Sequence, residues 1–329
     1  MIVTVTMNPA IDISGVVDEV APFRKLRCTE IRRDPGGGGI NVARVAQRFG
    51  VDVTALYPVG GTIGRLLQDL VTHEGITSRA IPVTEDTRED FTAYERKTGH
   101  EFRFVVPGPR LTETEWRNCL DALVELPVKP AFVVISGSLP PGVPEDFYVR
   151  IADIARSQGA KVAVDTSAAP FRRLLEAGVY LAKPNRRELQ EWAGTPLEDQ
   201  DSQVLAARRL VAAGHAEIVA LTLGHEGGLL VTRDQALRAF TPPVKPVSTV
   251  GAGDSFLGAM IVRLYRSDTL DNAFRYGIAA GTAALLAPGT DLSHPADVER
   301  ILPQVRVERL PGEPLSASAA YRASAAGPR

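Results

Sequence analysis

From about residue 112 onward, short apolar segments alternate with segments whose apolar positions recur every three or four residues. The first kind predicts buried strands, and the second predicts amphipathic helices. Strands and helices in alternation form βαβ units, so we expect a mostly parallel sheet covered by helices. The predicted strands are 132–135, 162–165, 180–182 and 218–223, and the predicted helices are 112–125, 145–157, 168–176 and 202–213.

The first hundred residues show a second pattern, in which alternating and β-branched segments dominate. Extended segments at 11–17, 26–31, 91–95 and 101–105 predict a small sheet apart from the main one, because the turn at 97–100 joins the last two as a hairpin. The same patterns predict strands at 3–6 and 51–56, helices at 40–49 and 63–70, a closing hairpin of 227–231 and 236–240, and helices at 253–265, 269–286 and 296–302.

These elements predict one domain over residues 1–310, into which the strands of the small sheet, from about 11–34 and 88–106, are inserted as a lid. Residues 311–329 consist largely of Pro, Ser, Ala and Gly with few apolar residues. A segment of that composition cannot bury enough apolar surface to fold, so a disordered tail is expected there.

Composition and charge narrow the class of protein. The 329 residues are 44% hydrophobic and 23% charged, and the formal net charge of −2 provides no field that would attract nucleic acid or an acidic membrane. Cys28 and Cys119 lie far apart and no C-x-x-C occurs, so neither a thiolate zinc site nor a disulfide framework is expected. The chain begins without a signal-peptide pattern. Its apolar stretch 276–286 is shorter than the about 20 residues that span a bilayer, so a cytoplasmic protein is expected.

The strongest local signal is STVGAGDSF at 248–256, which runs into an apolar helix. Small residues at 251–253 let several backbone N–H groups point at one spot where the helix begins, and such a spot favours an anion. Asp254 falls in the first turn, where its carboxylate suits the base of a phosphoryl transfer. Considered alone, the segment fits an ordinary helix cap equally well.

A second glycine-rich helix entry lies at Gly36–Gly39 and is followed by Ile40 and Asn41. It lacks the third glycine of the dinucleotide fingerprint, and the chain contains no Gly-Lys dipeptide of a P-loop. A glycine run beside an amide side chain is typical of close approach to a polyhydroxylated ligand. A hinge or a close-packed turn is the alternative.

Polar residues follow several predicted strands, at the edge where α/β proteins bind ligands. Asp12 would accept hydrogen bonds from sugar hydroxyls, or would cap a turn. Asn185 and Glu188 would face Mg²⁺-bound phosphates through water, although their spacing fits an N-cap box equally well. The glycine-rich turn at 222–228 is open enough to admit a nucleotide.

Two basic residues, Lys25 and Arg88, lie in the region of the predicted lid. If the small sheet covers the crevice, they would clamp a terminal phosphate of the substrate, Arg88 with two parallel N–H groups. Solvated surface charge is the alternative and the commoner role of such residues.

Taken in order, these motifs resemble those of the PfkB family of the ribokinase superfamily, from about residue 2 to about 302. The glycine-rich segments 36–50 and 248–260 correspond to the paired signatures of that family. The 1-phosphofructokinase and tagatose-6-phosphate kinase branches are similar in Asn8-Pro9, 183–188 and 248–255, but they typically carry lysine where this sequence has Gly38. The resemblance is strongest to the 6-phosphofructokinase branch of the minor isozyme type, through KLRCT at 25–29, PGGGGINVAR at 35–44, FRFV at 102–105, SGSLPPG at 136–142 and PPVK at 242–245.

The resemblance implies a ribokinase-like, three-layer αβα core with a mostly parallel sheet and a small β-sheet lid. It also implies a kinase that uses ATP and Mg²⁺ to phosphorylate fructose 6-phosphate at the C1 hydroxyl, giving fructose 1,6-bisphosphate. In the neighbouring branches the substrate is fructose 1-phosphate or tagatose 6-phosphate. A sugar-phosphate sensor without catalysis is an alternative of another class, and the presence of Asp254 beside 251–253 argues against it. Lids in this family commonly meet across a dimer, which implies a homodimer.

Matching positions imply a role for each residue. Asp254 would be the base, and the backbone amides of Gly251, Ala252 and Gly253 would form the anion hole. The sugar would be held by Asp12, Gly37, Gly38, Asn41 and Ser138, and its 6-phosphate by Lys25 and Arg88. The nucleotide side would be lined by Lys183, Asn185, Glu188, Thr222, Gly224, Gly227 and Thr282, with Asn185 and Glu188 facing Mg²⁺ through water. A monovalent cation such as K⁺ would be bound, mainly by backbone carbonyls, at Ser248, Val250, Ala284, Ala287 and Gly289.

Overall fold

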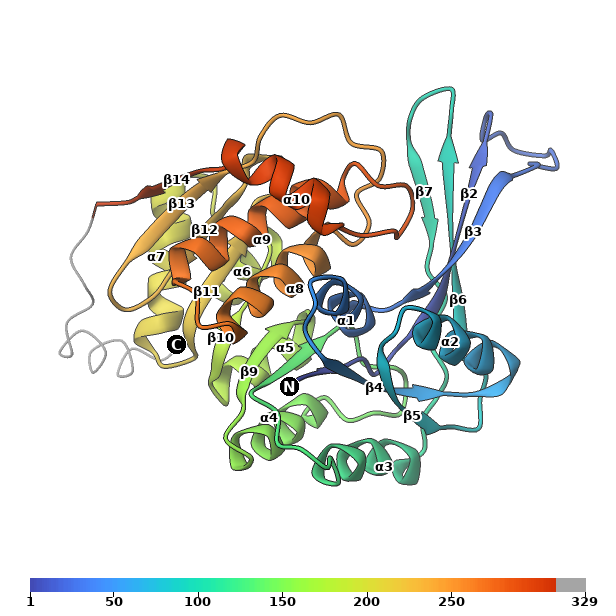
Figure 1. Ribbon diagram of the computed structural model, residues 1–329, viewed down its shortest axis with the longest axis horizontal. Coiled ribbons are helices and arrows are strands. Elements are labelled where there is room, and N and C mark those ends of the chain that lie inside the picture. Colours follow the sequence, from blue (N-terminus) through green and yellow to red (C-terminus); the bar gives the residue numbers. More distant parts are fainter. Residues whose placement is uncertain (312–329) are drawn as a thin grey trace.

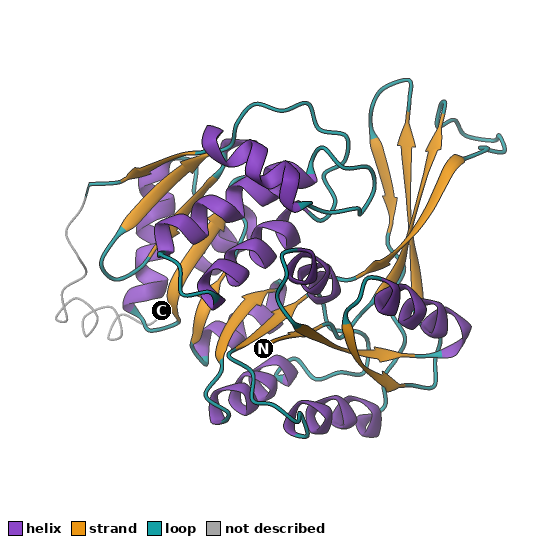
Figure 2. Ribbon diagram, viewed as in Figure 1, coloured by secondary structure: helices purple, strands orange, loops and turns teal. Residues whose placement is uncertain are grey.

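A ten-stranded sheet forms the centre of the computed structural model, which describes residues 1–311 (Figure 1, Figure 2). Its strands are β1 (Ile2–Val5), β4 (Val53–Val59), β5 (Thr77–Pro82), β8 (Phe132–Ser136), β9 (Lys161–Asp165), β10 (Val179–Ala182), β11 (Ala216–Thr222), β12 (Gly228–Val231), β13 (Ala236–Phe240) and β14 (Arg306–Arg309). Their order is β14-β13-β12-β11-β10-β9-β8-β1-β4-β5. Pairing is parallel from β5 to β11 and antiparallel from β11 to β14, which confirms the mostly parallel sheet.

Helices cover both faces of this sheet (Figure 2). One face carries α1 (Gly38–Arg48), α2 (Gly61–His73), α8 (Ala252–Tyr265), α9 (Leu270–Ala284) and α10 (Pro295–Ile301). The other carries α3 (Glu113–Val124), α4 (Phe147–Ser157), α5 (Ala168–Glu176), α6 (Arg186–Ala193) and α7 (Gln200–Ala212). Because both faces are covered, every residue of β1, β4 and β8 is buried, which explains their unbroken apolar runs. The three-layer αβα core is confirmed.

The lid is a separate four-stranded sheet that stands away from the core at one end of the molecule (Figure 1). Its strands are β2 (Ala10–Val17), β3 (Thr29–Gly36), β6 (Arg88–Glu95) and β7 (Glu101–Phe104), in the order β3-β2-β6-β7. The predicted hairpin is formed by β6 and β7.

The pairing register separates polar from apolar residues on the two faces of the lid. Asp12 lies opposite Asp34 on one side and Asp90 on the other, so these carboxylates share one face. Phe91 lies opposite Phe104 on the other face, where the two rings stack with centroids 6.4 Å apart. One surface of the lid therefore carries charged side chains, and the opposite one carries the stacked aromatic rings.

One strand prediction is wrong and two strands were missed. The segment 26–31 is not one strand: the chain is a loop up to residue 28, and β3 begins at Thr29 and continues to Gly36 because that segment pairs with β2. The edge strands β5 and β14 were not expected at all. In β5 only Ile81 is buried, and β14 has no buried residue, so neither carries the hydrophobic signal of a strand.

Two sequence expectations concern other parts of the chain. The predicted disordered tail lies outside the described residues, apart from Pro311. Among the described residues, no helix has the length and apolar character needed to cross a membrane.

Candidate active site

Charged residues lie together at the carboxyl ends of two parallel strands, near the start of α8. Asp165 ends β9 and Lys183 follows β10, and the Lys183 ammonium lies 2.9 Å from the Asp165 carboxylate. Lys183 is a neighbour of Gly253, since a β-carbon built at Gly253 would lie 3.3 Å from Lys183 Nζ. Burial disfavours the charged form of Lys183, but Asp165, with Asp254 and Glu188, outweighs it and raises the pKa of the ammonium, which stays charged.

The first turn of α8 offers unpaired backbone donors. Gly251 precedes the helix in the left-handed region, with φ of 75°, and a side chain there would collide with Leu292. Among the described residues, no hydrogen bond is made by the backbone N–H groups of Gly251, Ala252, Gly253 and Asp254. Free N–H groups at a helix N-terminus attract an anion, and Lys183 adds a positive charge beside them. The geometry fits the anion hole that the sequence predicts.

Asp254 does not cap its helix but points toward α1. Asn41 Nδ2 donates a hydrogen bond of 2.8 Å to Asp254 Oδ2, and no side-chain cap bond is made at the start of α8. Burial raises the pKa of Asp254 to about 6, with a further increase from Asp165, while the Asn41 hydrogen bond and the Lys183 charge lower it. The carboxyl group is therefore mostly ionised at pH 7 and able to accept a proton.

The sugar side of the predicted site gathers around Asp12 at the base of the lid. Gly36 lies so close to Asp12 that any side chain there would collide with the carboxylate. Asn8 Nδ2 donates a 3.2 Å hydrogen bond to Ser138 Oγ, which fixes the loop after β8. Gly37 and Gly38 lead from this region into α1. The structure thus brings together all five residues predicted to hold the sugar.

Arg103 and Asn8 also lie in this region, although neither was predicted as a site residue. Burial raises the pKa of Asp12 to about 6, and the charge of Arg103 is the largest effect opposing that rise. In the sequence, Arg103 stands out only as part of the family motif FRFV. The strand pairing that places it near Asp12 belongs to the tertiary structure and is not encoded in the local pattern. The side-chain oxygens of Asn8 and Asn41 are buried and accept no hydrogen bond among the described residues. The Asn8 oxygen packs against Gly108, whereas Asn41 is bonded to Asp254 through its amide nitrogen.

The two basic residues predicted to bind phosphate lie in different places. Arg88 begins β6 at the base of the lid, where its guanidinium lies 3.0 Å from the Asp90 carboxylate and donates to the carbonyls of Asn8 and Val106. Its charge also lowers the pKa of Asp12. Lys25 is exposed in the loop between β2 and β3, at the far end of the lid (Figure 1). Within one chain it is not brought together with the other site residues.

A cavity of about 480 Å³ adjoins the anion hole. Five of the predicted nucleotide residues line it, together with Ala252 and Gly253 of the anion hole. Its remaining walls are mostly apolar and come from α8, α9 and the loop before residue 250, which carry no motif for nucleotides. The predicted residues in the lining are Asn185, Thr222, Gly224, Gly227 and Thr282, and the unpredicted ones are His225, Thr241, Pro246, Thr249, Phe256, Ile278, Gly281 and Leu285.

Asn185 and Glu188 form the N-cap box of α6. Asn185 Oδ1 accepts from the Glu188 backbone N–H, and Glu188 Oε2 accepts from the Asn185 N–H, both at 2.9 Å. Burial and the nearby Asp165 raise the pKa of Glu188, so negative charge is crowded here and a divalent cation would relieve it. The described residues contain no group of three or more His, Cys, Asp or Glu side chains suited to a metal. This donor set fits Mg²⁺ bound mainly through water and phosphate oxygens.

The residues predicted to bind a monovalent cation lie on two loops that meet beside the anion hole. The backbone N–H of Val247 donates a 2.7 Å hydrogen bond to the Leu285 carbonyl, which brings 248–250 next to 284–289. The Ala284 carbonyl accepts from Ala287, whereas among the described residues the carbonyls of Val250 and Gly289 accept no hydrogen bond. Free carbonyls without a charged side chain fit a weakly held monovalent cation.

Comparisons with known proteins agree with this geometry. Residues 3–297 match the family described as pfkB family carbohydrate kinase. The chain is 46% identical over 299 residues to the ATP-dependent 6-phosphofructokinase isozyme 2 of Mycobacterium tuberculosis (strain ATCC 25618 / H37Rv), covering 91% of this chain and 88% of the relative. It is 37% identical over 266 residues to a 1-phosphofructokinase of Xanthomonas campestris pv. campestris, covering 80% of this chain and 83% of the relative.

Solved structures show the same similarity. The crystal structure of phosphofructokinase-2 from Escherichia coli in complex with substrates and products superposes with a TM-score of 0.88 and 36% identity, covering 92% of this chain and 98% of that chain. A structure of the same enzyme in complex with potassium has a TM-score of 0.87 and 36% identity, with the same coverage.

The buried Asp254 carboxylate predicts that Asp254→Asn stabilises the fold in a pH-dependent way. The pKa of Asp254 rises from 3.8 to about 6 on folding. The folded protein therefore holds this proton more tightly than the unfolded chain, and ionisation as the pH rises toward 6 removes stability. A rise of about two pKa units corresponds to roughly 3 kcal/mol. At pH 8 we therefore expect the variant to melt roughly 4–6 °C above the parent protein, and near pH 4 we expect this gain to vanish. Thermal unfolding followed by circular dichroism at both pH values measures it; an equal gain at both would contradict the assignment.

Proposed function

The chain belongs to the pfkB family of carbohydrate kinases, and from that premise we propose that it transfers the γ-phosphoryl group of ATP to the C1 hydroxyl of fructose 6-phosphate. It is a sugar-phosphate kinase with phosphofructokinase relatives. The observation that carries the proposal is the Asp254 carboxylate, which Asn41 holds between the free N–H groups of α8 and the polar base of the lid. The product in this proposal is fructose 1,6-bisphosphate.

Asp254 is the base in this reaction. A pKa of about 6 leaves its carboxylate mostly ionised at pH 7, and the Asn41 hydrogen bond holds one of its oxygens in place. The other oxygen is the acceptor for the proton of the C1 hydroxyl. In phosphoryl transfer the base mainly orients the attacking hydroxyl and receives its proton late, so a carboxylate of this pKa is sufficient.

Backbone N–H groups and Lys183 stabilise the charge of the transferring group. The N–H groups of Gly251, Ala252 and Gly253 point toward the place where the phosphoryl oxygens would gather negative charge. Lys183 stays protonated beside them because of Asp165. Donors fixed in advance inside a partly closed site are worth more than the same donors in water, because they need no reorganisation.

The cavity next to α8 is the ATP site in this proposal, since the anion hole forms its inner end. Lys183 and Glu188 lie at the same end, next to Asp165. Asn185 and Glu188 would hold Mg²⁺ through water, where the ion would neutralise charge on the ATP phosphates. The loops around Val250 and Gly289 would hold K⁺, a cation with which the Escherichia coli relative has been crystallised.

The sugar phosphate is held by Asp12, Asn41, Ser138 and the backbone at Gly37 and Gly38. Arg88 and Arg103 both lie near Asp12 at the base of the lid, since the charge of each lowers the pKa of Asp12. These two guanidinium groups supply the positive charge for the 6-phosphate. The relatives also include 1-phosphofructokinases, so fructose 1-phosphate is the second candidate substrate and tagatose 6-phosphate the third. A sensor without catalysis would have no need of a base beside the anion hole.

A coupled assay with ATP and each of the three sugar phosphates at equal concentration tests the proposal. We expect fructose 6-phosphate to have the highest kcat/KM. The Asp254→Asn variant should lower kcat by about 100-fold or more with little change in the KM for ATP, because a positioned base contributes about 10²–10⁴-fold. A kcat near that of the parent protein would remove Asp254 from the reaction. Binding of the sugar phosphate without any ADP release would favour the sensor.

Removing Arg88 should affect phosphorylated sugars only. Losing a charge-assisted contact to the 6-phosphate costs about 1.5–3 kcal/mol, so Arg88→Ala should lower kcat/KM for fructose 6-phosphate by roughly 10–150-fold. Turnover of unphosphorylated fructose should stay unchanged. The matched control is Lys97→Ala, which removes an exposed lid cation paired with Glu19. Equal losses on both sugars would show that Arg88 does not bind the phosphate.

A homodimer through the lid completes the proposal. Six large apolar side chains on the lid or just beyond its strands are exposed: Phe23, Leu26, Ile31, Phe104, Val105 and Val106. Exposed apolar side chains in this number are typical of a protein interface. Lys25 lies in the same loop as Phe23, so pairing of two lids would carry it toward the partner. That arrangement is the one under which Lys25 would bind a phosphate.

Charge placed on the aromatic face of the lid should separate the subunits. Phe104 is 58% exposed, and Phe104→Glu would bury a carboxylate in the interface, so we expect light scattering to show a shift from dimer to monomer. Leu205→Glu is the control, because Leu205 is 61% exposed on α7 of the core. A parent protein that is already monomeric, or a Phe104→Glu variant that stays dimeric, would rule out this interface.

A further inference from the structure

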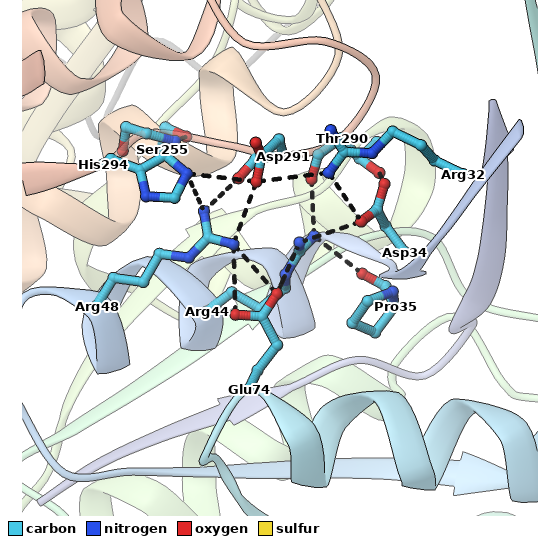
Figure 3. A network of polar contacts seen from close by, with 11 residues as sticks. Arg32, Asp34, Pro35, Arg44, Arg48, Glu74, Ser255, Thr290, Asp291 and His294 are labelled. Carbon is cyan, nitrogen blue, oxygen red and sulfur yellow. Dashed lines mark hydrogen bonds and ion pairs between the residues drawn. The ribbon is translucent and has the colours of Figure 1, made fainter. Parts of the chain in front are cut away.

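A buried arginine on α1 lies between the lid and the loop that follows α9. Arg44 is 1% exposed, and its Nη1 donates hydrogen bonds to two backbone carbonyls, Pro35 at 3.3 Å and Thr290 at 2.8 Å (Figure 3). The Glu74 carboxylate, at the end of α2, lies 2.9 Å from the Arg44 guanidinium and balances its charge. The Asp34 carboxylate lies 3.7 Å from the same guanidinium. Neither the proposed chemistry nor the sugar contacts use this side chain.

One of the two carbonyls belongs to the turn that holds the sugar. Pro35 is followed by Gly36, whose backbone lies against the Asp12 carboxylate. The Arg44 charge also lowers the pKa of Asp12. Asp34, on the same strand, accepts a 3.1 Å hydrogen bond from the Thr290 hydroxyl. The base of the lid is thus tied to Thr290 both directly and through Arg44.

The other carbonyl belongs to a loop that supports the anion hole. Two residues after Thr290, Leu292 adopts a positive φ of 63° and lies against Gly251. The next backbone N–H, from Ser293, donates a 3.2 Å hydrogen bond to Ser255 Oγ. The loop therefore contacts the first turn of α8 on both sides of Asp254. A buried non-glycine residue with positive φ persists only where its surroundings hold it firmly.

We propose that Arg44 is a positioning residue that joins the sugar turn at Pro35–Gly37 to the loop behind the anion hole, so that sugar phosphate and nucleotide strengthen each other's binding. The inference rests on the proposed function, because it assigns the sugar to the turn and the nucleotide to the cavity beyond α8. A planar guanidinium reaches two carbonyls and a carboxylate at once, which the single ammonium of a lysine cannot do in the same geometry.

The nearby Arg48 shows that not every arginine of the network has this role. It contacts Glu74, Asp291 and His294, and among the described residues it bonds neither Pro35 nor the rest of the sugar turn (Figure 3). Arg32 similarly joins Asp34 to Asp291 near the surface, at 3.7 Å from each. Of these three arginines, Arg44 alone bonds the backbone of both segments.

Binding measured by calorimetry tests the coupling without relying on turnover. The affinity for fructose 6-phosphate is determined with and without saturating Mg²⁺ and a non-hydrolysable ATP analogue, and the ratio of the two dissociation constants gives the coupling factor. For the parent protein we expect a factor of about five or more, and for Arg44→Lys a factor near one. The analogue alone should bind both proteins equally, because its cavity lies away from Arg44.

Thr290 provides an independent pair of variants in case the arginine variant does not fold. Thr290→Val removes the hydroxyl that bonds Asp34 and should reduce the coupling factor, whereas Thr290→Ser keeps the hydroxyl and should preserve it. Arg263→Lys is the control, because it changes a partly buried arginine on α8 that pairs with Asp268 and does not contact Arg44. It should leave the coupling factor unchanged. Thermal melts of every variant show that the fold is retained.

The outcomes separate this inference from the proposed function. If the parent protein shows coupling and both Arg44→Lys and Thr290→Val keep it, the proposed role of Arg44 is wrong. The kinase proposal would still stand. A parent protein that binds both ligands independently overturns it as well. A parent protein that binds neither fructose 6-phosphate nor the analogue contradicts the proposed function itself.

Discussion

The hydrogen bond between Asn41 and Asp254 joins the two glycine-rich helix entries on which the site depends. Asn41 lies in the first turn of α1 and Asp254 in the first turn of α8, and the two helices pack against each other. Burial of a carboxylate at this place is costly, and the amide of Asn41 and the charge of Lys183 offset part of that cost. These two contributions together help to keep the carboxyl group ionised near neutral pH.

The rest of the fold fixes the positions of these two helix starts relative to each other. Parallel strands that are buried on both faces place Asp165, Lys183 and Thr222 side by side at one edge of the sheet. The lid closes the crevice from the other side, and its hairpin also reaches the core, where Glu101 accepts hydrogen bonds from the backbone and side chain of Thr249. Thr249 lies next to the anion hole, so the lid contacts both the sugar side and the phosphoryl side.

The sequence predicted the core well, and it located the candidate site residues because motifs at strand ends and helix starts are local. Gly251–Gly253, Asp254 and Asn41 lie where the motifs indicate, and the parallel βαβ order follows from the hydrophobic period. What escaped prediction depends on tertiary pairing. Arg103 faces Asp12 only through the register of β6 and β7, and the apolar wall of the nucleotide cavity, with Phe256 and Ile278, has the composition of ordinary core.

The two faces of the lid make the protein intolerant of single-residue changes in the length of the lid strands. A sheet with alternating faces exchanges them when one strand slips by a single residue. Loss of one residue just before β6 would turn Asp90 outward and Phe91 toward the crevice, so the acidic lining and the aromatic contact surface would fail together. Exposed peripheral segments usually accept changes in length with little consequence. In this protein the length of each lid strand is constrained as tightly as that of a strand in the core.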